Sequence, residues 1–139
     1  MKSTNFFILL KTLLFFLALF SCNKAEVQIP WTNLIANEGL EGWYIKGGTA
    51  IYENNNGTIV GTTVADTPNT FLSSNKIYKD FILEIDFKVD PDMNSGIQIR
   101  SNSLPYYRDG IVHGYQIEID PSKRAWSGGV YDEKRRLWL

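Results

Sequence analysis

The most regular stretch of the sequence is Phe81–Val89, where apolar and polar residues alternate. From Leu83 onward every second residue is apolar, and Glu84, Asp86 and Lys88 stand between the apolar positions. Successive side chains of a β-strand point to opposite faces, so this period of two places the apolar and charged residues on different sides. The pattern predicts a half-buried β-strand over Phe81–Val89.

Shorter segments with the same period follow at 97–100 and 115–120. Asn55-Asn56-Gly57 separates two apolar segments and predicts a hairpin, because Asn and Gly tolerate the positive φ that a tight hairpin turn needs. After the first 21 residues no window keeps the helical period. The pattern therefore predicts an all-β fold, an antiparallel two-sheet β-sandwich of the jelly-roll type.

The end of the sequence affects how complete this sandwich is expected to be. The segments above give six or seven strands, and a jelly roll usually has about eight. The sequence reaches Leu139 through the apolar Leu137 and Trp138, without a turn or a polar tail. We therefore expect the C-terminal part of the domain to be missing.

The first 21 residues have the composition of an export signal. Lys2 and Lys11 accompany an unbroken apolar run over Leu13–Phe20, which is shorter than the roughly 20 residues that span a bilayer. Cys22 follows directly after a small residue, Ser21, as in bacterial lipoprotein signals. We expect Cys22 to be acylated and the protein to be lipid-anchored to a bacterial membrane, facing the periplasm or the cell surface. The alternative is an ordinary export signal with an unrelated cysteine near its cleavage site.

The mature part would then consist of a polar tether at 22–30 and one domain at 31–139. It retains 12 Lys and Arg against 15 Asp and Glu, a formal charge of −3. We expect no nucleic-acid partner, because phosphate binding relies on a basic surface. The chain has a single cysteine, so an internal disulfide is excluded and the domain must be held together by packing.

Polar residues of two predicted strands form the first group of candidate site residues. If these strands lie in one sheet with matching faces, five side chains converge on one surface: Gln98, Arg100, Gln116, Glu118 and Asp120. Two carboxylates can divide acid and base roles when their environments separate their pKa values. The alternative is a solvated outer face with surface salt bridges.

His113 and several aromatic residues form the second group. A lone histidine on a turn is more often a surface residue than a catalyst, but it can act as a base or a metal ligand near neutral pH. The chain has one histidine, which excludes a multi-histidine zinc site; a divalent cation would need Asp, Glu and backbone oxygens. The aromatic residues either pack in the core or stack on sugar rings; they are Tyr106, Tyr107, Tyr115, Trp126, Tyr131 and Trp138.

Three segments together resemble one known family. Asn94–Arg100, Gly114–Asp120 and Trp126–Glu133 are similar, in this order, to the motifs of the 3-keto-disaccharide hydrolase domain family. The resemblance covers Trp31–Leu139. It implies a concanavalin-like jelly roll, often exported or lipid-anchored, that acts on carbohydrates, and family members usually continue beyond the length of this sequence.

The resemblance also implies a chemistry for the polar face. A ketone at C3 of a sugar acidifies the hydrogen on C2; a base removes it, the enolate expels the group on C1, and water adds back. The base would be Glu118 or Asp120, with His113 in reserve. Arg100 would hold the enolate or a sugar hydroxyl, and a divalent cation is a further way to stabilise that charge. The other expected substrate-binding residues are Gln98, Gln116, Tyr115, Tyr131 and Trp126.

Two alternatives to this enzyme stay open at the level of sequence. One is a non-catalytic carbohydrate-binding module on the same lectin-like sandwich, since this fold serves both purposes. The other is an inert truncated relative of the enzyme.

Overall fold

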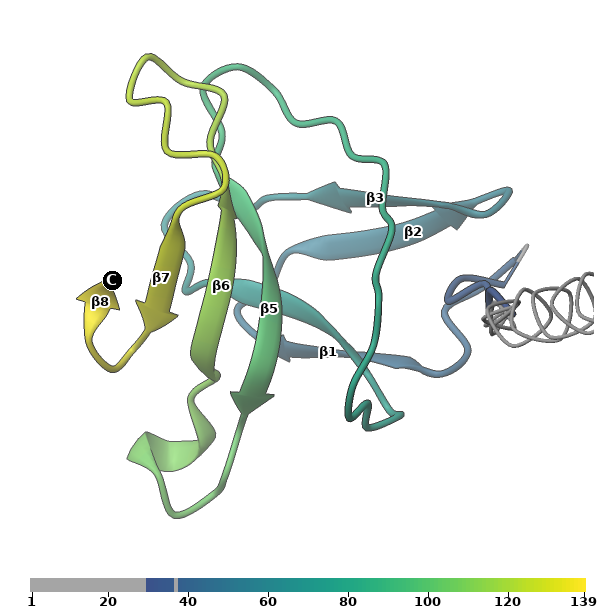
Figure 1. Cartoon of the computed structure of the whole chain (residues 1–139), viewed down its shortest axis with the longest axis horizontal. Helices are drawn as coiled ribbons and strands as arrows, with labels where there is room; N and C mark the ends of the chain where they lie inside the picture. Colours follow the sequence, from purple (N-terminus) through teal and green to yellow (C-terminus); the bar gives the residue numbers. More distant parts are fainter. Residues whose placement is uncertain (1–29, 37) are drawn as a thin grey trace, which may run out of the picture. The chain divides into compact units, whose positions relative to one another are not determined.

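The computed structural model describes residues 30–36 and 38–139 (Figure 1). The predicted signal, Cys22 and nearly all of the predicted tether lie outside the described residues. Within the described residues, all regular secondary structure lies in the compact unit Leu34–Leu139. It comprises one 3-10 helix, η1 (Arg108–Gly110), and the strands β1 (Trp43–Gly47), β2 (Ile51–Asn55), β3 (Thr58–Thr62), β4 (Thr70–Ser74), β5 (Ser95–Asn102), β6 (His113–Ile119), β7 (Val130–Glu133) and β8 (Leu137–Trp138).

The strands form three antiparallel sheets: β1 with β4, β2 with β3, and a four-stranded sheet in the order β5-β6-β7-β8 (Figure 1). No α-helix occurs in the part of the chain that the structure describes. The prediction of a mostly β, antiparallel fold is therefore confirmed. The closed two-sheet sandwich of the jelly-roll type stays a prediction.

The hairpin β2–β3 is formed as its sequence predicts. Asn56 and Gly57 occupy the turn with φ of 52° and 84°, the positive values that Asn and Gly accept most readily. The side chain of Asn54 accepts a hydrogen bond from the Gly57 amide at 2.8 Å. The turn thus fixes the register in which Ile51 lies opposite Thr62.

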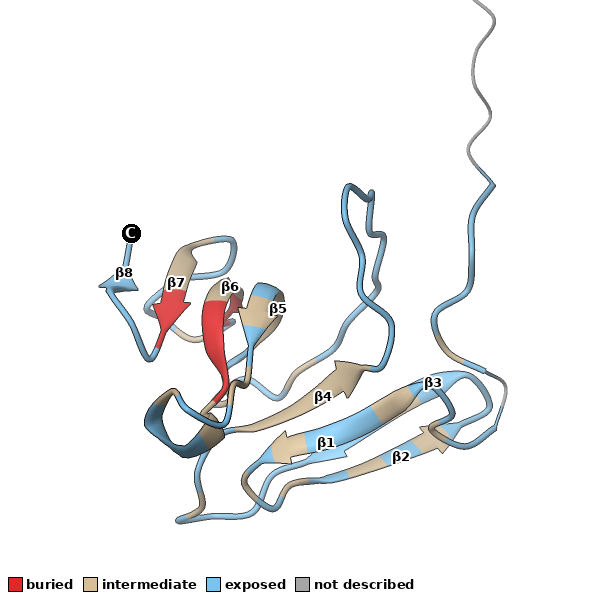
Figure 2. Ribbon diagram, turned by 90° about the horizontal axis from the view of Figure 1, so that it is seen from below, coloured by how far each residue is buried: buried red, intermediate tan, exposed pale blue. Residues whose placement is uncertain are grey.

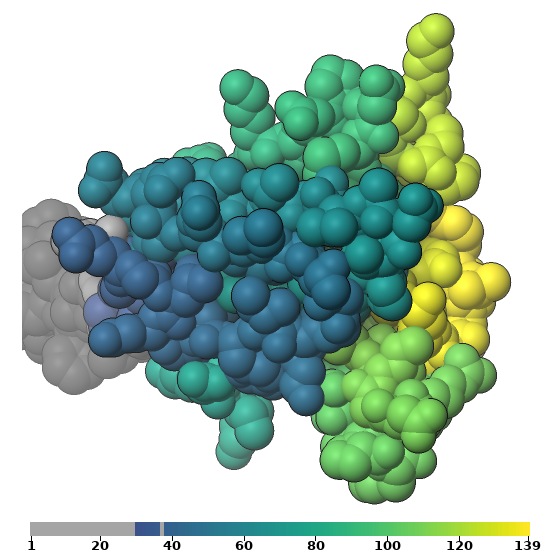
Figure 3. Space-filling view, turned by 180° about the vertical axis from the view of Figure 1, so that it is seen from behind, coloured from purple at the N-terminus to yellow at the C-terminus, as the bar shows by residue number. Residues whose placement is uncertain are grey.

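Single side chains connect the sheets. The Tyr52 hydroxyl of β2 donates to the carbonyl of Thr70 in β4 at 3.1 Å, and the side-chain amide of Asn69 donates to Glu133 of β7 at 3.3 Å. In the space-filling view the teal residues around β4 accordingly lie against the yellow residues of the last strands (Figure 3).

The segment Phe81–Val89 differs from its prediction. It is not a β-strand: no strand pairs with it among the described residues, and it runs as irregular chain between β4 and β5. Its apolar side chains are largely exposed, with Ile85 at 55% and Phe87 at 58%. Alternation shows that a segment suits a half-buried sheet, but a strand also needs a neighbouring backbone for its hydrogen bonds.

Burial is concentrated in the four-stranded sheet. The buried residues cluster in β6 and β7 (Figure 2), and most of them are polar or charged. Val112 and Ile119, each 7% exposed, are the only buried apolar residues in the described part of the chain. The sheet β5-β6-β7-β8 therefore carries the best-defined interior, and it also contains the candidate site residues.

Candidate active site

The register of the four-stranded sheet brings several predicted site residues to one face. Gln98 of β5 lies opposite Gln116 of β6, and Gln116 lies opposite Tyr131 of β7. Side chains directly opposite one another share a face, and so do residues two apart on one strand, which adds Glu118. We call this side of the sheet the Glu118 face.

A continuous chain of hydrogen bonds crosses the Glu118 face. The Ser101 hydroxyl donates to Gln98 at 2.5 Å, the Gln98 amide donates to Gln116 at 3.5 Å, and the Gln116 amide donates to Oε2 of Glu118 at 2.9 Å. Asn94, in the turn before β5, donates to the other carboxylate oxygen at 2.9 Å. The side-chain amides of Asn94, Gln98 and Gln116 thus donate in the direction of Glu118, which is 3% exposed. Two amides thus fix the orientation of a buried carboxylate.

Two glycines leave space for the side chains that form this series of hydrogen bonds. A Cβ at Gly96, which lies opposite Glu118, would be 2.4 Å from Cγ of Gln116, so only glycine lets the Gln116 side chain pass over β5. A Cβ at Gly114 would be 2.6 Å from Cα of Ser101, and Gly114 has a φ of 143°. Both glycines belong to the motifs that carry the family resemblance.

Arg100 does not join the other polar side chains, contrary to the predicted convergence. The register shifts between Ile99 and Asn102, and Arg100 has a φ of 51°, as in a β-bulge. The extra residue turns Arg100 to Asp80, with Nη2 3.6 Å from the carboxylate, and brings Ser101 to Gln98 instead. Alternation from Gln98 alone cannot reveal a bulge two residues further on.

The Asp120 carboxylate contacts residues of the loop that follows β6. Its carboxylate is fully buried; Oδ1 accepts a hydrogen bond from the Ser122 amide at 3.0 Å, and Oδ2 forms an ion pair with Arg124 at 2.8 Å. Hydrogen bonding by the Ser122 side chain is the main cause of a lowered pKa of Asp120; the Ser122 amide and Arg124 lower the pKa further, and together they outweigh burial. Of the two predicted bases, Glu118 is therefore the one that lies on the shared polar face.

His113 is buried rather than on the surface. Its Nδ1 lies 2.9 Å from the carbonyl of Ile111, and because a carbonyl only accepts, Nδ1 carries the proton. The ring packs on Tyr107 with a centroid distance of 4.1 Å. Through these contacts His113 stabilises the start of β6, and none of them is with Glu118.

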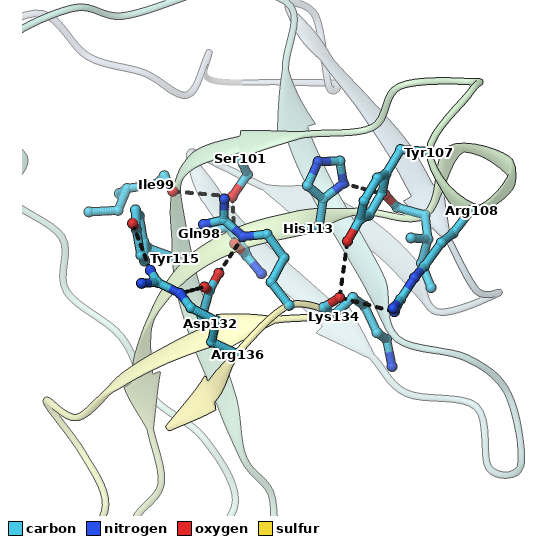
Figure 4. A network of polar contacts seen from close by, with 12 residues as sticks. Gln98, Ile99, Ser101, Tyr107, Arg108, His113, Tyr115, Asp132, Lys134 and Arg136 are labelled. Carbon is cyan, nitrogen blue, oxygen red and sulfur yellow. Dashed lines mark hydrogen bonds and ion pairs between the residues drawn. The ribbon is translucent and has the colours of Figure 1, made fainter. Parts of the chain in front are cut away.

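Tyr115 lies on the opposite face of the sheet, beside an ion cluster that the sequence analysis did not single out (Figure 4). Its partner across the strands is the fully buried Asp132, which accepts hydrogen bonds of 2.6 Å from Nε of Arg135 and Nε of Arg136. Arg136 also donates to the Tyr115 hydroxyl at 2.9 Å. The spacing of three and four residues after Asp132 is the signal in the sequence that would have indicated these pairs.

The electrostatics of this cluster favour its charged state. Burial alone would raise the pKa of Asp132, but the hydrogen bonds from Arg136 and Arg135 outweigh burial and lower it. The same contact with Asp132 raises the pKa of Arg136. The Tyr115 hydroxyl is thus engaged by Arg136, away from the Glu118 face.

Three aromatic side chains pack at the β7–β8 side of the sheet. Trp138 contacts Trp126 and Tyr131 edge to face, with centroid distances of 4.8 and 5.1 Å. Trp126 and Tyr131 were predicted substrate-binding residues, and Trp138 was predicted as one of several aromatic residues that either pack in the core or stack on sugar rings. The structure brings all three together, and we call them the aromatic cluster.

The described residues contain no group of three or more His, Cys, Asp or Glu side chains placed to hold a metal ion. The divalent cation stays a prediction. Within the same residues, no helix is long and apolar enough to cross a membrane.

Comparison with known families decides where the chain belongs. The family model of the 3-keto-alpha-glucoside-1,2-lyase-like domain matches residues 30–138. The chain belongs to this family. A search of curated proteins finds no match. Membership in the 3-keto-alpha-glucoside-1,2-lyase-like family agrees with the resemblance in the sequence, and it indicates a carbohydrate-cleaving enzyme domain with a carbohydrate substrate.

Proposed function

We propose that this 3-keto-alpha-glucoside-1,2-lyase-like domain cleaves 3-keto-glycosides with Glu118 as the general base. The observation that carries the proposal is the buried Glu118 carboxylate, whose two oxygens accept hydrogen bonds from two side-chain amides. A base must have a fixed position to abstract a proton from carbon efficiently. The amides of Asn94 and Gln116 supply this fixation.

The reaction has two stages. Glu118 takes the proton from C2, and the C–H electrons form an enolate with the C3 carbonyl. The enolate then returns its electrons to form a C1–C2 double bond, and the bond from C1 to the leaving oxygen breaks as that oxygen takes up a proton. Water adds to C1 and C2 is protonated again, so the net change is hydrolysis; release before water addition gives the lyase product.

The developing negative charge on the C3 oxygen needs hydrogen-bond donors. Ser101 and Gln98 are the neutral donors that extend the chain away from Glu118. Arg100 stays a predicted substrate contact, because its exposed ion pair with Asp80 contributes little and leaves the side chain free to turn. An Arg100→Ala variant with reduced kcat/KM would support that contact.

The test is a comparison of three carboxylate variants on a 3-keto-disaccharide, with released sugar measured by chromatography. We expect Glu118→Gln to lower kcat by about 100-fold or more, the usual contribution of a positioned general base. Glu133→Gln is the matched control, because Glu133 is buried to the same 3% but contacts Asn69 and Lys134. Asp120→Asn should keep the kcat of the wild type and have a lower stability. Full activity of Glu118→Gln would end the proposal.

A non-catalytic carbohydrate-binding module is the second proposal, and the exposed aromatic cluster is the observation that favours it. Trp126 and Trp138 are 41% and 43% exposed, as expected of a stacking surface for sugar rings. This alternative predicts saturable glycan binding without any released sugar, in the wild type and in Glu118→Gln alike.

We also propose that Cys22 is the lipid attachment site and that the domain is tethered to a membrane. The proposal is supported by the apolar run that ends at Phe20-Ser21-Cys22. Incorporation of a labelled fatty acid into the wild type, and its loss in Cys22→Ala, is the expected result. Equal labelling of both proteins would contradict it.

A further inference from the structure

We propose that the aromatic cluster of Trp126, Tyr131 and Trp138 is a second subsite, which binds the leaving group of the substrate when that group has a ring. The inference rests on the proposed function of Glu118, and it adds Trp138 to the predicted substrate-binding residues Trp126 and Tyr131.

The position of Trp138 follows from the pairing of β6 and β7. Ile117 lies opposite Val130, and the chain continues so that Glu118 faces Gly129, with the Glu118 amide donating to the Gly129 carbonyl at 2.9 Å. A Cβ at Gly129 would be 3.0 Å from Cζ3 of Trp138. The Trp138 ring therefore covers the side-chain position next to Glu118 across the strands, which glycine leaves open.

Trp126 is fixed beside Trp138 by a separate set of contacts. The Arg124 guanidinium lies 4.4 Å from the centre of the Trp126 ring, and Arg124 in turn pairs with the buried Asp120 at 2.8 Å. An aromatic ring held from one side by a cation is pre-organised, so it loses little conformational freedom when a ligand packs on it. In this arrangement Asp120 is a positioning residue for Trp126.

The Glu118 face thus has different chemistry on its two sides. Toward β5, Gln98 and Ser101 offer amide and hydroxyl groups, and toward β8 the aromatic cluster offers apolar rings. The reaction places C2 of the keto sugar at Glu118, and the leaving group is bonded to the adjacent C1. The keto sugar carries the hydroxyls and carbonyl that suit the amide side, so the leaving group extends toward the aromatic side. A flat ring, either a pyranose or an aromatic aglycone, fits such a surface.

The first experiment compares two 3-keto-glucosides that differ only in the leaving group, phenyl or methyl. For Trp138→Ala and Trp126→Ala we expect kcat/KM to fall about 10-fold with the phenyl glycoside and less than about 2-fold with the methyl glycoside. Trp138→Phe should keep most of the activity. Tyr106→Ala is the control, because Tyr106 is an 85% exposed aromatic residue outside the cluster. Equal losses with both glycosides would overturn the proposal.

A second measurement separates this subsite from the proposed catalysis. Unoxidised phenyl and methyl glucosides are titrated while tryptophan fluorescence is followed. We expect phenyl glucoside alone to quench the wild type, and the quenching to disappear in Trp138→Ala. Such binding without turnover of any 3-keto-glucoside would refute the catalytic proposal and keep the subsite. Turnover that depends on Glu118, with equal quenching in wild type and Trp138→Ala, would refute the subsite alone.

Discussion

At the scale of single residues, the function depends on how Glu118 is held. Its two oxygens accept hydrogen bonds from Asn94 and Gln116, which come from a turn and from the same strand. Both donors are neutral side-chain amides rather than cations. An Arg partner would form a stronger, charge-assisted bond and compete with the substrate proton.

This arrangement predicts a specific effect of Asn94→Ala. Loss of one hydrogen bond leaves the Glu118 carboxylate less well oriented, so kcat should fall about 10-fold while KM changes little. Steady-state kinetics with a 3-keto-disaccharide measures both constants. Asn54→Ala is the control, because Asn54 also supplies side-chain hydrogen bonds, but in the β2–β3 turn. A rise in KM without a change in kcat would mean that Asn94 binds substrate instead.

Asp132 gives a second prediction at this scale, for stability against pH. The pKa of Asp132 is lowered in the folded protein, so on acidification the unfolded chain is protonated at this residue before the folded protein is. The ionised Asp132 therefore stabilises the fold above the ordinary aspartate pKa, and this stabilisation is lost as the pH falls through the pKa of Asp132 in the folded protein. At pH 7 Asp132→Asn should melt below the wild type, and the difference should shrink as pH falls below about 4. Thermal unfolding across this range measures it. A constant difference at every pH would contradict the ionic origin.

At the scale of elements, the sequence shows clearly which segments suit a sheet. The period of two over 97–99 and 115–119 corresponds to β5 and β6, and Asn56-Gly57 specifies its own hairpin. The same period fails over Phe81–Val89, because pairing depends on a neighbour that alternation does not reveal. The displacement of Arg100 has a similar cause, since a bulge is set by the partner strand.

The two glycines of the Glu118 face allow a test of this element. In Gly96→Ala the new methyl group meets only the Gln116 side chain, so we expect kcat to fall with little change in melting temperature. In Gly114→Ala the methyl group meets the Ser101 backbone at a φ of 143°, so the fold itself should be destabilised. Kinetics and thermal unfolding of both variants separate the effects. A Gly96→Ala enzyme with normal kcat would show that the Gln116 contact is dispensable.

The segment Phe81–Val89 gives a matching prediction for stability. Phe87→Ser removes an exposed side chain and should leave the free energy of unfolding nearly unchanged, whereas Ile119→Ala removes a buried one and should cost about 2–4 kcal/mol. Chemical denaturation compares the two variants. A large loss in Phe87→Ser would show that this segment is packed against a partner in solution.

At the scale of the whole molecule, the family membership and the residues of the Glu118 face point to the same kind of chemistry. Membership in the 3-keto-alpha-glucoside-1,2-lyase-like family indicates a carbohydrate substrate, and the Glu118 face carries the carboxylate that we propose as the base. The sequence motifs were sufficient to predict Gln98, Gln116 and Glu118 on one surface. The motifs could not show which of Glu118 and Asp120 is the better candidate for the base. The two acidic residues are two positions apart in one alternating segment, and they differ only in their hydrogen-bond and ion-pair partners.

The most direct test of the central claim is turnover of a 3-keto-disaccharide in D₂O, with the product examined by NMR. Abstraction by Glu118 and reprotonation from solvent predict one deuterium at C2 of the released keto sugar for every turnover, above the slow exchange seen without enzyme. Neither release nor this C2 labelling should occur above that background in Glu118→Gln. Released keto sugar that retains its original hydrogen at C2 would mean that the glycosidic bond breaks without C2 deprotonation, and would contradict the account.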